Sequence, residues 1–146
     1  VPEECLVSFA KHNSQNLNEY NVPHNGLFDS GILLSLTIGA EHMRDSKSLV
    51  DILEKQKAAG KKYAAVCAAP AVVLASNGLL EDPGATCYPA PQFREKLADP
   101  TDDKVAVTGA VTTSQGPGTS LLFALELGEQ LFGKETRDKI QKEMLL

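Results

Sequence analysis

The sequence lacks three features that would assign it to an obvious functional class: a cluster of basic residues, a long hydrophobic segment and closely spaced cysteines. The net charge is −5 and Lys61-Lys62 is only a pair, which argues against a nucleic-acid-binding surface. The apolar segments near 32–38 and 63–75 are shorter than the roughly 20 residues that span a bilayer, or are interrupted by Pro70. No secretory signal is visible. We therefore expect no nucleic-acid partner and no membrane association.

Cysteine is scarce, and the number of cysteines is odd. Cys5, Cys67 and Cys87 are spread over 146 residues, a length that can build one hydrophobic core without disulfide bonds. No two of them have the spacing of zinc ligands, and the three histidines are scattered. We expect a reducing, cytoplasmic environment and no metal site.

Apolar and amphipathic segments alternate along the chain. The pattern predicts strands at 28–38, 62–67 and 85–88, with one bent strand or a hairpin at 104–114. It predicts helices at 46–59, 70–77, 119–132 and 134–146, with a helical turn or two at 92–97. The asparagine-rich residues 1–27 are expected to be mostly loop, with one short element near 4–11. Strands that alternate with helices predict a single α/β domain over 1–146, with a mainly parallel sheet covered on both faces.

Cys67 stands where a strand turns sharply into a helix. The apolar residues 63–66 precede it, and Ala68, Ala69 and Pro70 follow it. This arrangement predicts a thiol at the edge of the sheet, with the N-terminus of a helix directed at its sulfur. We expect such a thiol to ionise more easily than a free cysteine, whose pKa is about 8.5. The alternative is a buried, inert structural cysteine.

Three segments resemble those of a known family. They are Ala-Ala-Val-Cys-Ala-Ala-Pro at 64–70, Thr-Thr-Ser-Gln-Gly-Pro-Gly-Thr-Ser at 112–120 with Phe-Ala-Leu at 123–125, and Gly-Ala-Glu-His-Met-Arg-Asp-Ser at 39–46. With them the chain resembles the ThiJ/PfpI superfamily, and within it the DJ-one branch of stress-protective proteins. The resemblance covers 28–146. It implies a flavodoxin-like three-layer α/β sandwich, here with an incomplete N-terminal edge.

The resemblance also implies a function that depends on the cysteine and needs no cofactor. It implies the glutathione-independent conversion of methylglyoxal to lactate, or the removal of early glyoxal adducts from proteins. The partners would be small α-oxoaldehydes or glycated proteins, and family members form homodimers. The site residues implied are Cys67 as nucleophile, the backbone of Ala68 and Leu36 as oxyanion donors, and Tyr88, His42, Gly116 and Pro117 as pocket residues.

The chain departs from the family pattern around this site. Leu34-Ser35-Leu36 stands where the family has Pro-Gly-Gly, Tyr88 where members often carry a histidine, and Gln115 where an arginine is usual. The family glutamate that shares a proton with the cysteine has no counterpart that we can assign, because Glu3 and Glu4 lie too near Phe28. These departures leave open a catalytically silent family member.

Other interpretations use the same residues. A redox-sensing or chaperone-like protein would also need the Cys67 thiol. A peptidase is disfavoured because Ala68 occupies the place of the histidine that would serve as its base. His42 either approaches Cys67 or is an ordinary exposed histidine at a helix entry. Cys87 either resolves an oxidised Cys67 or simply packs in the core.

Overall fold

The computed structural model describes residues 5–9, 30–35, 37–80 and 82–146. In chain order the elements are β1 (Cys5–Phe9), β2 (Ser30–Ser35), α1 (Thr37–Asp45), α2 (Lys47–Ala58), β3 (Lys62–Cys67), the wide π-type turn η2 (Pro70–Leu74), the 3-10 turn η3 (Ala75–Asn77), α3 (Pro91–Arg94), β4 (Val105–Thr108), β5 (Val111–Ser114), the 3-10 turn η4 (Pro117–Thr119), α4 (Ser120–Phe132) and α5 (Lys134–Glu143).

The five described strands form one mainly parallel sheet, in the order β1-β2-β3-β5-β4. The first four strands in this order run parallel, and only β4 is antiparallel to its neighbour β5. Ser35 pairs with Cys67, and Val66 pairs with Ser114, so the carboxyl ends of β2, β3 and β5 meet at one edge. The predicted α/β fold with a mainly parallel sheet is confirmed.

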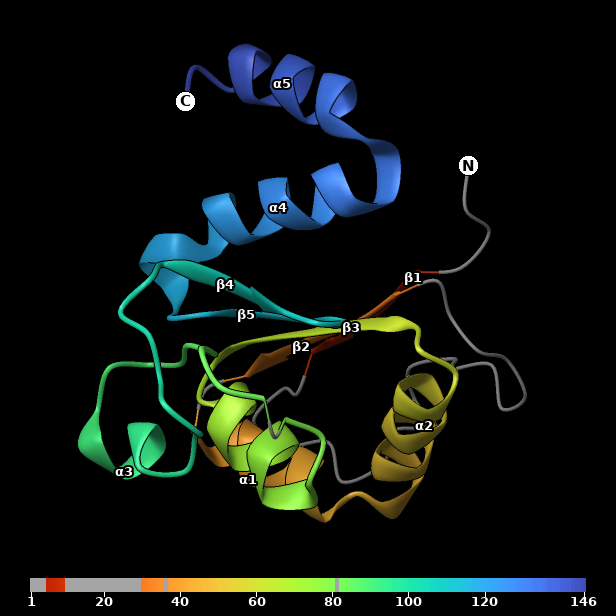
Figure 1. Cartoon of the computed structure of the whole chain (residues 1–146), viewed down its shortest axis with the longest axis vertical. Coiled ribbons are helices and arrows are strands. Elements are labelled where there is room, and N and C mark those ends of the chain that lie inside the picture. Colours follow the sequence, from red (N-terminus) through yellow and green to blue (C-terminus); the bar gives the residue numbers. More distant parts are fainter. Residues whose placement is uncertain (1–4, 10–29, 36, 81) are drawn as a thin grey trace.

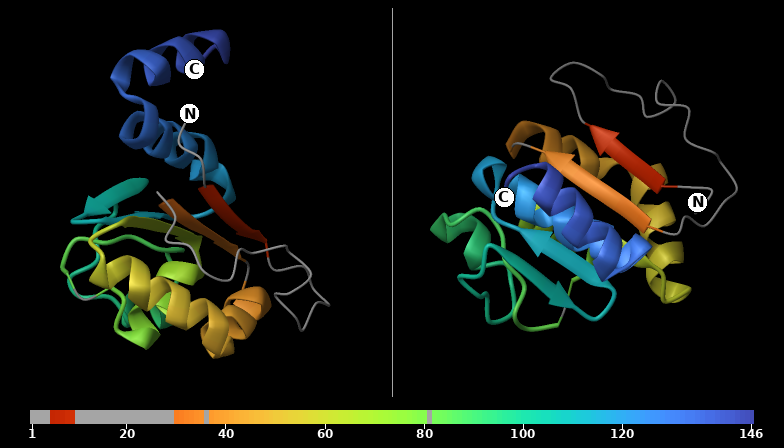
Figure 2. Two further views of the ribbon diagram at one scale, coloured as in Figure 1. Left: turned by 90° about the vertical axis from the view of Figure 1, so that its right-hand side faces the viewer. Right: turned by 90° about the horizontal axis from the view of Figure 1, so that it is seen from above.

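Helices cover the sheet on both faces. In Figure 1, α1, α2, α3 and η2 lie below the sheet and α4 lies above it. Figure 2 shows from two further sides that α5 lies beyond α4, away from the sheet. Side chains of β3 alternate between the two faces: Tyr63 and Ala65 belong to the larger core, whereas Ala64 and Val66 pack with Phe123 of α4. Strand β3 is therefore buried on both faces.

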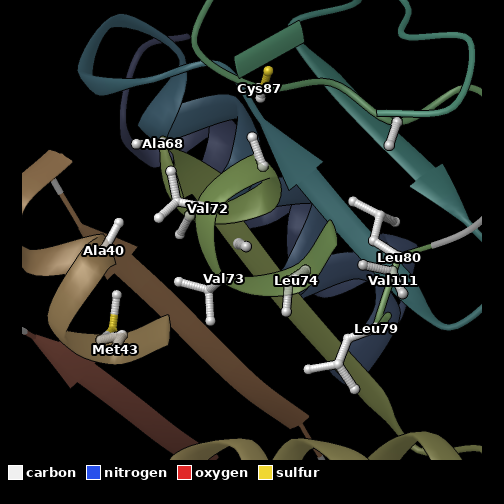
Figure 3. Packing of buried hydrophobic residues seen from close by; sticks show 14 of the residues in the cluster. Ala40, Met43, Ala68, Val72, Val73, Leu74, Leu79, Leu80, Cys87 and Val111 are labelled. Atoms are coloured by element: carbon white, nitrogen blue, oxygen red, sulfur yellow. The ribbon is translucent and has the colours of Figure 1, made fainter. Parts of the chain in front are cut away.

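The larger core surrounds the turn that follows β3. Val73 and Leu74 of η2 are fully buried there, beside Ala40 and Met43 of α1. Figure 3 shows these side chains gathered around the ribbon of η2. Because the core encloses η2, the backbone just after Cys67 is held firmly in place.

Several element boundaries differ from those predicted. The segment 28–38 is not one strand, because β2 ends at Ser35 and α1 begins at Thr37. A continuous apolar run cannot by itself distinguish a strand from a buried helix, and here its last two residues, 37–38, begin the helix that turns Ala40 and Met43 to the core. Segment 70–77 is helical with the predicted bounds: the π-helix η2 is followed directly by the 3-10 helix η3, and Gly78 at φ 66° ends the segment.

Two further segments also differ in detail. Segment 85–88 is not a strand of the sheet, although Thr86 N–H donates to Thr113 Oγ1 at 3.0 Å and Tyr88 N–H donates to the Cys67 carbonyl at 2.8 Å. Segment 104–114 is the hairpin alternative, with Gly109 at φ 58° in its turn. The short element expected near 4–11 is strand β1, so the N-terminal edge holds one more strand than expected, and residues 10–29 lie outside the described part.

Candidate active site

Cys67 has a strained backbone. It is the last residue of β3, and its φ of 68° lies in the left-handed region that non-glycine residues rarely adopt. Such a conformation costs roughly 1–2 kcal/mol relative to the right-handed one. The sharp bend predicted between strand and turn is therefore present. Strain of this kind persists where the surrounding structure over-determines the backbone, which is common at functional sites.

The atoms around Cys67 hold this backbone in place. The carbonyl of Cys67 accepts the N–H of Tyr88 at 2.8 Å, and the carbonyl of Ala68 accepts the N–H of Val72 at 2.9 Å. The Cys67 side chain packs in the smaller cluster with Phe123, and the residue is only 9% exposed. Cys67 is therefore largely shielded from solvent by its neighbours.

Burial raises the pKa of the Cys67 thiol, and a hydrogen bond from the backbone of Ala68 lowers it by a smaller amount. The expectation that Cys67 ionises more easily than a free cysteine is therefore wrong. Desolvation disfavours the thiolate. The helical segment after Cys67 spans only 70–77, so its dipole field is weaker than that of a long helix. The resting state at neutral pH is the protonated thiol.

Tyr88 and Gly116 meet beside Cys67. The Tyr88 residue is 46% exposed, and its ring packs edge-on against Phe93 with centroids 6.3 Å apart. A Cβ atom placed on Gly116 would lie 3.6 Å from a ring carbon of Tyr88. The backbone bond between Tyr88 and Cys67 places this aromatic pair next to the nucleophile position. Phe93 is a site neighbour that the sequence did not single out.

A small hydroxyl network fixes the turn that carries Gly116. The N–H of Gly116 donates to Thr119 Oγ1 at 3.1 Å, and this hydroxyl lies 2.6 Å from Ser114 Oγ. Both hydroxyl groups are buried. Thr119 directly precedes α4, but its hydroxyl bonds the turn at Gly116 and makes no capping hydrogen bond to that helix. The spacing of Gly116 and Thr119, three residues apart, is the signal that identifies this network in the sequence.

The remaining expected site residues are less closely joined to Cys67. His42 on α1 and Pro117 in η4 are both exposed, and no hydrogen bond or ion pair links either to Cys67 in the described structure. Leu36 lies outside the described residues, as do Glu3 and Glu4. The pocket residues that the structure brings together are therefore Tyr88 and Gly116.

Cys87 is a second thiol near the elbow, the sharp bend at Cys67 between β3 and η2. It is fully buried, and its Sγ donates to the carbonyl of Tyr88 at 3.4 Å. The pKa of Cys87 is raised to about 11, mainly by burial; the charge of Arg94 opposes this rise, and Cys67 adds a smaller contribution to it. The two thiols are thus close enough to interact electrostatically. The described ranges contain no group of three or more His, Cys, Asp or Glu side chains that could hold a metal ion.

Comparison with known proteins identifies the family. The sequence model of the DJ-1/PfpI family matches residues 37–130. The chain belongs to the DJ-1/PfpI family. The match begins at α1 and extends into α4, so it includes the elbow at Cys67, Tyr88 and the turn at Gly116. The resemblance noted from the sequence motifs, to the DJ-1 branch of this superfamily, is confirmed.

Similar proteins come from distant organisms. Protein DJ-1 homolog A of Arabidopsis thaliana is 41% identical over 82% of this chain and 31% of its own length. A Caenorhabditis elegans protein named glutathione-independent glyoxalase DJR-1.2 is 30% identical over 74% of this chain and 58% of its own. The structure titled Toxoplasma gondii DJ-1, oxidized, has a TM-score of 0.75 at 38% identity, covering 81% of this chain and 64% of that one.

This chain therefore spans less than two thirds of each of these relatives. The segments that it shares with them nevertheless include the strand, elbow and turn described above. Separately, none of the helices in the described ranges is long and apolar enough to cross a bilayer.

Proposed function

We propose that this chain carries the nucleophile of a cofactor-free stress-defence enzyme that converts small α-oxoaldehydes such as methylglyoxal to 2-hydroxy acids. The observation that carries the proposal is the strained elbow, which puts Cys67 at the carboxyl edge of the sheet at φ 68°. Membership of the DJ-1/PfpI family and similarity to a nematode protein named as a glyoxalase support it.

The chemistry starts with the Cys67 sulfur attacking the aldehyde carbon of methylglyoxal. A hemithioacetal forms, and its oxygen accepts a hydrogen bond from the N–H of Ala68, the residue whose backbone lowers the pKa of the thiol. Transfer of the proton from the former aldehyde carbon to the ketone carbon, through an enediol, gives a thioester. Water then hydrolyses the thioester to lactate and frees the thiol. The aldehyde carbon is oxidised and the ketone carbon reduced, so no external oxidant is needed.

The tight surroundings of the sulfur favour a small substrate over a glycated protein. Cys67 is only 9% exposed, whereas an adduct on a lysine or arginine would have to bring a protein surface to the sulfur. Tyr88 forms the half-exposed rim and can hydrogen-bond a carbonyl or hydroxyl group of the substrate. We expect the free aldehyde to react faster than the same aldehyde on a protein side chain.

The test is lactate formation from methylglyoxal by the purified chain without glutathione. Cys67→Ala should abolish the activity, while Cys5→Ala should retain it as a matched control. Because burial raises the pKa of Cys67, the rate should rise with pH above neutrality as the thiolate population grows. Equal lactate formation by wild type and Cys67→Ala would refute the proposal.

A second candidate is a peroxide sensor that uses the same sulfur. The narrow access to Cys67 suits hydrogen peroxide, and the Ala68 N–H can stabilise a sulfinate oxygen. Selective addition of two oxygen atoms to Cys67, without any lactate formation, would favour this function. If Cys67 reacts neither with peroxide nor with iodoacetamide, the chain is a catalytically silent family member.

A further inference from the structure

Cys87 has no role in the chemistry proposed above, although it lies beside the elbow. Cys87 and Cys67 are both free and both buried. Cys87 precedes Tyr88, whose N–H is bonded to the carbonyl of Cys67. The peptide that joins Cys87 to Tyr88 therefore lies directly against the residue that carries the proposed nucleophile.

This backbone contact limits the distance between the two cysteines. The hydrogen bond is 2.8 Å long. With standard peptide dimensions on either side, the two Cα atoms can be at most about 7.6 Å apart. The bends at the carbonyl and amide shorten this span toward the range of about 4.4–6.8 Å that disulfides bridge.

We propose that Cys87 is a resolving thiol, which captures a peroxide-oxidised Cys67 as a reversible Cys67–Cys87 disulfide. The inference rests on the proposed reactivity of the Cys67 sulfur, but not on lactate formation. It assigns a role to a buried thiol that the aldehyde chemistry leaves unused. It also makes the site switchable by hydrogen peroxide and by thiol reductants.

The reaction proceeds in two balanced steps. Hydrogen peroxide oxidises the Cys67 thiol to a sulfenic acid and releases one water, and the O–O bond breaks. The Cys87 sulfur then attacks the Cys67 sulfur. The S–S bond forms, the S–O bond breaks, and the hydroxyl group leaves with the Cys87 proton as a second water.

Closing the bond requires a side-chain rotation. Cys67 packs in the smaller cluster with Phe123, and Cys87 packs in the larger core, so the two sulfurs occupy different sets of neighbours. Rotation of Cys87 about its Cα–Cβ bond gives up the weak 3.4 Å contact of its Sγ with the Tyr88 carbonyl and the packing of its sulfur in the larger core.

The experiment is titration of the reduced chain with hydrogen peroxide, followed by alkylation and peptide mapping without reductant. We expect a cross-linked peptide containing Cys67 and Cys87, a loss of two hydrogens, and full recovery of both thiols with dithiothreitol. In Cys87→Ala, Cys67 should collect at least about threefold more sulfinic acid at the same peroxide dose, because no thiol intercepts the sulfenic acid. Cys5→Ala is the matched control and should behave as wild type.

The inference is overturned if wild type and Cys87→Ala form sulfinic acid at the same rate and no cross-linked peptide is found. The proposed function would then remain intact. No reaction of Cys67 with peroxide or iodoacetamide would overturn both. The decisive measurement looks for the cross-link in the wild-type chain, so it does not depend on whether a variant folds.

Discussion

Exchanging Cys67 for alanine and for glycine separates the strain of the elbow from the chemistry of its sulfur. Both variants lose the thiol, so neither can react, and only their stabilities differ. Alanine keeps the cost of about 1–2 kcal/mol that a Cβ imposes at φ 68°. Glycine removes that cost, but its backbone loses more entropy on folding, which costs about 0.5–1 kcal/mol, and the variant also lacks the buried methyl group of alanine.

These opposing contributions nearly cancel at position 67. We therefore expect Cys67→Gly and Cys67→Ala to differ by less than about 0.5 kcal/mol. Ala69 is the matched control, because it is fully buried two residues away but has an ordinary φ of −61°. Because position 69 has no strain to relieve, Ala69→Gly should lower the free energy of unfolding by about 1–2 kcal/mol, which corresponds to a fall in melting temperature of roughly 2–8 °C.

Urea denaturation measures both comparisons, with the slope of the transition checked for a change in the unfolded state. The comparison of interest is the alanine-to-glycine difference at position 67 against that at position 69. If the loss at 67 equals the loss at 69, the left-handed backbone carries no strain, and the structural argument for a functional elbow fails.

Other substitutions test the packing and the buried polar groups. Tyr63→Phe should lower the free energy of unfolding by about 1–3 kcal/mol, because the Tyr63 hydroxyl donates to a buried carbonyl at 2.6 Å. Tyr88→Phe changes a half-exposed ring and should lower it much less, as a thermal melt of both variants would show. Leu74→Ala should cost about 2–5 kcal/mol in urea, and Leu122→Ala less than about 1 kcal/mol; equal costs would contradict the assigned core. The raised pKa of Cys87 means that the unfolded chain loses this proton first, so stability is full below about pH 8.5 and falls as pH rises toward 11. Cys87→Ala should flatten that part of the stability profile, and an unchanged slope would show that the thiol is not desolvated.

Local sequence patterns were sufficient for the elements around the elbow. Strand β3 was predicted with the bounds that it has, because a buried strand with a short turn after it leaves a distinctive run of apolar and small residues. Gly78 ends the helical segment 70–77, and Gly116 and Thr119 form the turn before α4; both features depend on residues that are neighbours in the sequence. The α/β class followed from the alternation of strand and helix patterns.

The prediction failed where short segments depend on distant neighbours. Segment 85–88 has strand-like composition, but its partners are the Thr113 side chain and the Cys67 carbonyl rather than a sheet strand. The first two residues of α1, 37–38, were assigned to the preceding strand, because an apolar run is compatible with either element. Phe93 joins the site only because the chain brings it against Tyr88.

By itself, then, the sequence determined the fold class, the position of the elbow and the identity of its thiol, since each depends on residues that are neighbours along the chain. Only the tertiary structure decided how that thiol behaves. Its pKa is set by the balance between desolvation and a single backbone amide, and its proximity to Cys87 by one hydrogen bond between segments about 20 residues apart in sequence. Both depend on which atoms surround the sulfur in space, and residue order alone does not specify them.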